Sequence, residues 1–285
     1  KQAFSLMEVL VAVSILAILM SILFGIFQET TRAWGASEKA SNAYREARAA
    51  LFLISRDVQN AFISEDLPMI INDIDMIPTS ASLPTITNPD DGNNSLFFAV
   101  LRPDLINGVD NKSDVCVVGY YPAWVTVHGS SVTGFLGTQR TYVLKRYFAL
   151  SNDVWNDIIQ KLVPTNPLDP TSKPSFADLI YARTPPPSTQ DETLASNVTN
   201  FRVDYLTDST VSASNDPLEY PDSTSSSQSI VQIILSLDAI NGDTATKAPL
   251  ATDNTSWTSS TPLYKENARR FTVRVDVPQP QSPLP

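Results

Sequence analysis

Two stretches of the chain concentrate the oxygen ligands that calcium prefers, one near residue 90 and one between residues 104 and 114. Neither stretch has the twelve-residue spacing of an EF-hand. Asp and Asn also favour turns for purely local reasons. We therefore predict no cofactor and keep calcium as the alternative, to be tested by native mass spectrometry with and without a chelator. The possible ligands are Asp90, Asp91, Asn93, Asp104, Asn107, Asp110 and Asp114.

Side chains suited to catalysis are few. His128 is the only histidine, which excludes a multi-histidine metal site and leaves one residue for a histidine-based triad. Cys116, the only cysteine, lies in an apolar run typical of a buried, inert thiol. The chain has no glycine-rich phosphate loop. Carboxylates are numerous, but nothing selects a pair for glycoside hydrolysis. The sequence predicts a protein that is not an enzyme.

The charge of the chain argues against a nucleic-acid partner. The net charge is −10, and residues 61–285 carry 14 Lys and Arg against 25 Asp and Glu, a balance of −11. Binding to phosphates needs a basic surface. We therefore expect no nucleic acid among the partners.

One acid, Glu8, is distinguished by its position. It comes directly before Val9–Phe27, a stretch of 19 residues without a charge. As a helix that stretch would cover roughly 29 Å, close to the hydrocarbon thickness of a bilayer. An ionisable group at the edge of such a span is costly and calls for a functional role and a partner.

The residues around this acid resemble a known family. The run Ala3-Phe4-Ser5-Leu6-Met7-Glu8-Val9-Leu10-Val11-Ala12 is similar to the cleavage and methylation segment of type IV pilins and pseudopilins. The resemblance implies that prepilin peptidase cuts between Ala3 and Phe4, that the new amino terminus is methylated, and that Glu8 stays in the mature subunit for assembly. Ala3 departs from the glycine that usually precedes the cut. An ordinary signal peptide or a signal anchor is the alternative. A signal peptide has a shorter apolar region than this one, and a signal anchor leaves Glu8 unexplained.

The organisation of the chain follows from this segment. We expect residues 1–3 to be the end of a leader, residues 4–27 a transmembrane helix, and residues 28–62 the extramembrane half of the same helix. Gly25 and Gly35 weaken that helix by up to roughly 1 kcal/mol each. Apolar residues at intervals of three and four give its second half one buried stripe. The stripe comprises Ala40, Ala43, Tyr44, Ala47, Leu51, Ile54, Val58 and Phe62.

Residues 63–285 read as a globular domain of antiparallel strands joined by long loops rich in Pro and Ser. A short helix capped by Asn152 should interrupt the strands, with Val154, Trp155, Ile158, Ile159 and Leu162 on one face. A long helix followed by antiparallel strands is an α+β, pilin-like architecture. The expected strands are 96–101, 115–121, 124–127, 141–150, 198–206, 229–237 and 271–277.

Several blocks resemble one branch of the family, the J-type minor pseudopilin of type II secretion, and also the Verru_Chthon cassette protein C group. The blocks are Arg48–Val58, Val117–Tyr121, Tyr142–Tyr147 and Leu194–Tyr205. This resemblance implies a structural subunit of a type II secretion or type IV pilus-like assembly. Its single helix would cross the inner membrane, its domain would be periplasmic or otherwise extracytoplasmic, and its partners would be other pilin or pseudopilin subunits. The alternative is a membrane-anchored periplasmic binding protein or hydrolase with a pilin-like export segment, which neighbouring genes would distinguish.

Overall fold

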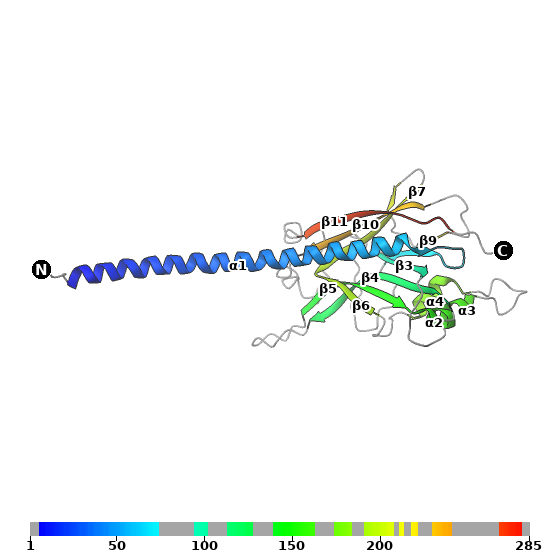
Figure 1. The fold of residues 1–285 in the computed structure, drawn as a ribbon, viewed down its shortest axis with the longest axis horizontal. Helices are drawn as coiled ribbons and strands as arrows, with labels where there is room; N and C mark the ends of the chain where they lie inside the picture. Colours follow the sequence, from blue (N-terminus) through cyan, green and yellow to red (C-terminus); the bar gives the residue numbers. More distant parts are fainter. Residues whose placement is uncertain are drawn as a thin grey trace, which may run out of the picture. The chain divides into compact units, whose positions relative to one another are not determined.

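The computed structural model describes residues 6–73, 94–101, 113–127, 139–162, 174–183, 191–207, 211–213, 218–221, 230–240 and 268–280. Its first element is one long helix, α1 (Leu6–Gln59), which is continuous through Gly25 and Gly35 (Figure 1). The chain forms two compact units, Lys1–Asn42 and Ala43–Pro285. The second unit contains the last part of α1 and every strand.

The larger sheet has seven antiparallel strands in the order β6-β5-β4-β3-β2-β9, with β1 paired to β3. Its strands are β1 (Ala61–Phe62), β2 (Met69–Asp73), β3 (Asn94–Leu101), β4 (Val115–Val127), β5 (Gln139–Ala149), β6 (Asp191–Ser196) and β9 (Leu218–Tyr220).

The smaller sheet has four antiparallel strands in the order β11-β10-β7-β8. Asn197, between β6 and β7, has a positive φ of 55° and passes the chain from one sheet to the other. Asparagine tolerates this left-handed conformation better than most residues. The strands are β7 (Val198–Thr207), β8 (Val211–Ala213), β10 (Ile230–Ile240) and β11 (Ala268–Asp276).

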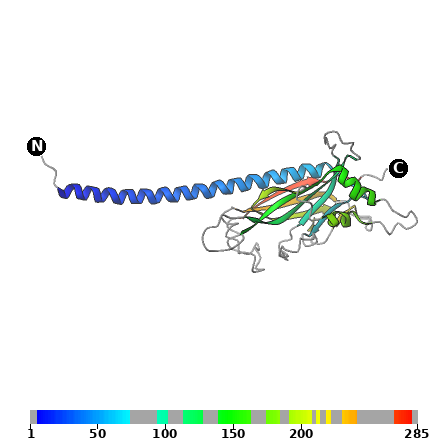
Figure 2. The same cartoon turned by 90° about the horizontal axis from the view of Figure 1, so that it is seen from below.

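The main core lies where the end of α1 meets both sheets (Figure 2). Small and branched residues on one face of α1 let the helix approach closely. They pack against Leu96, Phe98 and Val118 of the larger sheet and against Phe201 and Leu235 of the smaller one. The helix contributes Ala43, Ala47, Ala50, Leu51, Ile54 and Val58, all buried. Most of the stripe predicted for this half of the helix is therefore confirmed.

A second core covers the opposite face of the larger sheet. Phe97 and Ala99 of β3 point to this face, while Leu96 and Phe98 point to the main core. A strand buried on both faces reads as a continuous apolar run, as β3 does. The covering elements are α2 (Ser151–Val154), the π-helical turn η2 (Trp155–Ile159), α3 (Gln160–Leu162) and α4 (Phe176–Arg183).

The structure differs from the sequence prediction in several elements. Helix α1, which we also call the stem helix, ends at Gln59. Phe62 belongs to β1 rather than to the helical stripe. Residues 115–127 form one strand rather than the two expected. Pro122 is tolerated inside it because it lies beyond Tyr120, the last residue of β4 that pairs with β3, so its missing N–H breaks no bond to β3. The cap expected at Asn152 is wrong, since α2 begins at Ser151.

Candidate functional site on the stem helix

The first part of α1 exposes all of its large apolar side chains. From Leu6 to Phe27 these side chains are 50–82% exposed. This helix is the one, among the described residues, that is long and apolar enough to cross a membrane. The first unit offers these side chains no apolar partner, so their burial requires lipid or another molecule.

The hydroxyl groups of Ser14, Thr30 and Thr31 are satisfied within the helix itself. Ser14 Oγ donates a hydrogen bond of 2.8 Å to the carbonyl of Leu10, and the Thr30 and Thr31 hydroxyls bond the carbonyls of Ile26 and Phe27, also at 2.8 Å. Polar groups placed in lipid must find partners inside the protein. The helix therefore presents an apolar surface despite its serine and threonines.

Glu8 is the only charged residue of the described helix before Glu29, and it lies in the first turn of α1, exposed. A negative charge near a helix amino terminus is favoured by the helix dipole. The predicted processing residues, Ala3 and Phe4, lie outside the described residues.

The described structure does not test the predicted calcium ligands, because it includes one of the seven. Asp90, Asp91, Asn93, Asp104, Asn107 and Asp110 lie outside the described residues, as does His128, and Asp114 is exposed at a bend before β4. Among the described residues no three His, Cys, Asp or Glu side chains are grouped so that they could hold a metal ion. Cys116 is buried, as predicted.

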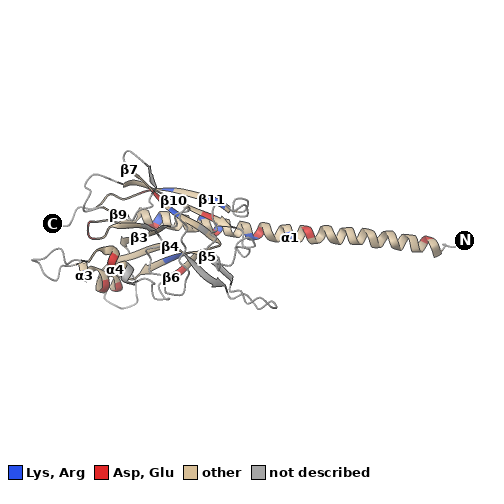
Figure 3. Cartoon of the chain, turned by 180° about the vertical axis from the view of Figure 1, so that it is seen from behind, with Lys and Arg blue, Asp and Glu red and all other residues tan. Residues whose placement is uncertain are grey.

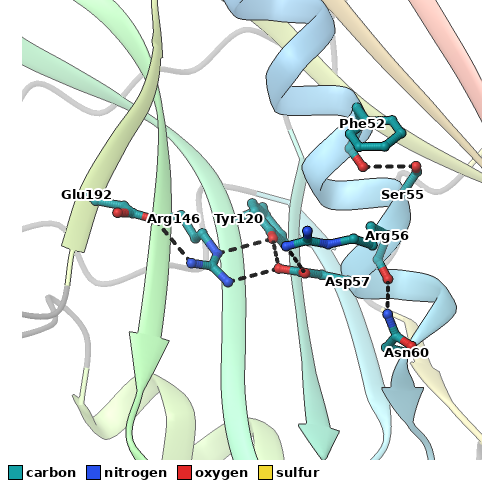
Figure 4. Close-up of polar contacts among 8 residues, drawn as sticks. All are labelled: Phe52, Ser55, Arg56, Asp57, Asn60, Tyr120, Arg146 and Glu192. Carbon is teal, nitrogen blue, oxygen red and sulfur yellow. Dashed lines mark hydrogen bonds and ion pairs between the residues drawn. The ribbon is translucent and has the colours of Figure 1, made fainter. Parts of the chain in front are cut away.

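Sequence reasoning missed a polar cluster at the other end of the stem helix (Figure 4). Asp57 accepts a hydrogen bond of 2.6 Å from the Tyr120 hydroxyl of β4 and one of 2.9 Å from Arg146 of β5. Arg146 also donates to Tyr120 at 3.3 Å and to Glu192 of β6 at 3.1 Å. Both charged side chains of the central pair are only 12% exposed. The cluster ties the last turns of α1 to three strands.

Burial controls the ionisation of this cluster. It raises the pKa of the Tyr120 phenol far above its usual value, and the neighbouring Asp57 carboxylate adds to the effect. Burial opposes the charged form of Arg146, but Tyr120 and Asp57 outweigh it and raise the pKa of the guanidinium. The phenol thus stays protonated and the Arg146 guanidinium stays charged. This arrangement suits a structural lock better than proton transfer at neutral pH.

The comparisons with known proteins concern the amino-terminal segment and the fold. A family model described as the prokaryotic N-terminal methylation motif matches residues 1–24. The chain therefore begins with the type of segment that type IV pilins and pseudopilins carry at their amino terminus. The match confirms the recognition made from residues 3–12, and the apolar helix with this motif indicates a membrane-anchored protein.

The search of solved structures found a type IV-like pilin from Thermus thermophilus. It is 12% identical to this chain, with a TM-score of 0.36, and the match covers 82% of this chain and 96% of the other. None of the curated protein sequences compared with the chain matches it.

Proposed function

We propose that the protein is a minor pilin or pseudopilin-like structural subunit of a type II secretion or type IV pilus-like assembly. The observation that carries the proposal is Glu8, at the start of an exposed apolar helix whose next charged residue is Glu29. The methylation motif covers the same residues. A role in assembly explains both the exposed surface and the acid, and it requires no catalytic group.

The proposal also assigns location and processing. Prepilin peptidase would cut between Ala3 and Phe4. The apolar helix would anchor the protein in the cytoplasmic membrane, with the β domain on the outer side. Other pilin or pseudopilin subunits would then pack along the exposed helix as it leaves the lipid for a filament or tip complex.

In this proposal Glu8 works by charge neutralisation. Cleavage before Phe4 creates an amine four residues before Glu8. This amine would pair with Glu8 of the same subunit or of a neighbour. A charge left in lipid costs roughly 2–3 kcal/mol or more near the membrane centre, and less at the interface. Pairing with an amine offsets this cost, and pairing between subunits favours one axial register over the others.

Glu8→Leu tests this role. The variant should insert in the membrane and be cleaved like the wild type, while the fraction that co-purifies with partner subunits should fall about tenfold, because the register-setting pair is lost. Glu8→Asp should be intermediate, since it keeps the charge but loses reach. The measurement is co-purification of tagged protein with the other subunits.

Glu29→Leu is the matched control, because Glu29 lies at the other end of the uncharged stretch, 80% exposed and 4.0 Å from Arg32. It should leave co-purification unchanged. Full co-purification of the Glu8→Leu variant would show that Glu8 is merely a tolerated acid at the membrane surface.

A further inference from the structure

Two arginines on the second unit are held over aromatic rings where α1 meets β11. The Arg48 guanidinium carbon lies 5.3 Å from the centre of the Phe271 ring, and that of Arg269 lies 5.8 Å from the same ring. Arg269 also lies 5.5 Å from the Tyr44 ring, which is 5.7 Å from Phe271. We call Tyr44, Arg48, Arg269 and Phe271 the arginine–aromatic cluster.

The rings of this cluster form a fixed base and the guanidinium groups form its surface. Tyr44 and Phe271 are partly buried and pack against the main core, whereas Arg48 and Arg269 are exposed. An exposed cation–π contact is worth about 0.5–1 kcal/mol. Each contact restrains a side chain that would otherwise be mobile, which lowers the entropy lost when the arginine binds a ligand.

The charges of the cluster are not neutralised within the described part of the chain. Neither Arg48 nor Arg269 forms an ion pair with a carboxylate among the described residues. Other arginines of the same unit do, as Arg146, Arg202 and Arg270 show. The contrast is informative because the chain has 30 acidic and only 20 basic residues. Figure 3 shows where the acidic and basic residues of the described part lie.

The geometry of the cluster also favours an anion. Two positive groups near one ring repel each other, since their separation is at most about one Debye length, ~10 Å at 0.1 M salt. A guanidinium in contact with a ring face leaves N–H donors available for a carboxylate, which can accept two hydrogen bonds from them. A carboxylate would therefore relieve the repulsion and use donors already in place.

We propose that the arginine–aromatic cluster is a docking surface for an acidic segment of a protein partner. The chemistry that recognises the partner is the carboxylate group of Asp or Glu. The proposal deepens the assembly function by assigning the chemistry of one partner contact, and in that sense it rests on the proposed function. Binding to an isolated peptide can still be measured in the absence of assembly.

The test uses the full chain in neutral detergent micelles and a fluorescein-labelled decapeptide of glutamate, with binding followed by anisotropy at low ionic strength. Arg48→Glu/Arg269→Glu should weaken binding about tenfold or more. Arg48→Lys/Arg269→Lys should weaken it less, because lysine keeps the charge but loses the planar contact with the ring.

Arg32→Glu/Arg274→Glu is the matched control, with the same change in net charge at one exposed arginine of α1 and one of β11. It should change binding less than threefold. If the two charge-reversed variants lose the same affinity for the peptide, binding depends only on net charge and the proposal is overturned. The absence of peptide binding to the wild type would also overturn it. Binding by the lysine variant as tight as that of the wild type would overturn the role of the rings.

A soluble anionic lipid, dihexanoylphosphatidylglycerol, separates a protein partner from a membrane surface. It should displace the peptide no better than sodium chloride of equal ionic strength. Strong displacement that disappears in Arg48→Glu/Arg269→Glu would identify a lipid headgroup site and overturn the proposal. The peptide-binding experiment contains no other subunit, so its result is independent of the co-purification experiment on Glu8. Each proposal can therefore fail while the other stands.

Discussion

The two parts of helix α1 place their apolar side chains in opposite environments. From Leu6 to Phe27 the helix exposes large apolar residues and carries one acid. From Ala43 to Val58 it buries small and branched residues and fixes itself to the strands through Asp57. The buried face of the second part is satisfied by its own chain, whereas the apolar surface of the first depends on molecules outside it. Anchoring through the helix is therefore to be sought in the first part, and the stability of the domain in the buried face of the second.

Arg146→Ala should produce the largest loss of stability. It leaves the Asp57 carboxylate, 12% exposed, without its cationic partner. Removing one partner of a buried pair costs roughly 3–5 kcal/mol. The measurement is the free energy of unfolding of the β domain in urea, on the full chain in detergent.

Arg32→Ala, between the two parts of the helix, is the control for this comparison. Arg32 and Glu29 are 77% and 80% exposed, and a pair of this kind contributes between about 0 and 1 kcal/mol. A loss below about 1 kcal/mol for Arg146→Ala would mean that the end of α1 is no better fixed by charge than its beginning.

Gly119→Ala should have the next largest effect. A methyl group at this position of β4 would overlap the Cδ1 and Cε1 atoms of the Phe97 ring. Overpacking of this kind costs about 1–3 kcal/mol. Gly25→Ala and Gly35→Ala meet no atom within 4 Å and should leave the free energy of unfolding of the β domain unchanged. If Gly119→Ala also leaves the free energy of unfolding unchanged, the Phe97 ring can shift to make room for the methyl group. The second core is then less tightly packed than the structure indicates.

At neutral pH Tyr120→Phe should have the smallest effect of these variants, and its signature is a change in the pH dependence of the free energy of unfolding. The folded state keeps the Tyr120 phenol protonated well above its ordinary pKa of 10.0, whereas the unfolded chain releases the proton near that value. The unfolded state then binds fewer protons, so wild-type stability falls as pH rises above about 10, by at most ~1.4 kcal/mol per pH unit. The phenylalanine variant should lack this component. Parallel stability curves for the two proteins between pH 10 and 12 would contradict the buried phenol.

The sequence predicted most reliably those elements whose signal is local. The apolar stripe gave the second half of α1, and the alternation of Phe271, Val273 and Val275 indicated β11. Helix α4 was missed inside a loop rich in Pro and Ser. Its signal is a reciprocal cap between Ser175 and Asp178, with backbone N–H bonds of 3.0 and 3.3 Å to the two side chains.

Contacts between distant residues could not be predicted. Asp57 and Arg146 are 89 positions apart, and the local sequence around either residue does not indicate the other as its partner. The two-sheet arrangement was missed for a similar reason, since it depends on β10 pairing with both β7 and β11. Of the candidate site, the motif and the exposed helix were predicted because both lie in one continuous run of sequence.

The most direct test of the account is the intact mass and amino-terminal sequence of the protein extracted from membranes. If α1 is a pilin-type segment retained for anchoring and assembly, the mature chain should begin at Phe4, carry a methyl group on its amine, and include Glu8. A mature amino terminus downstream of the apolar stretch, near Gly35, would show that the segment is a signal peptide removed on export, and would contradict the account.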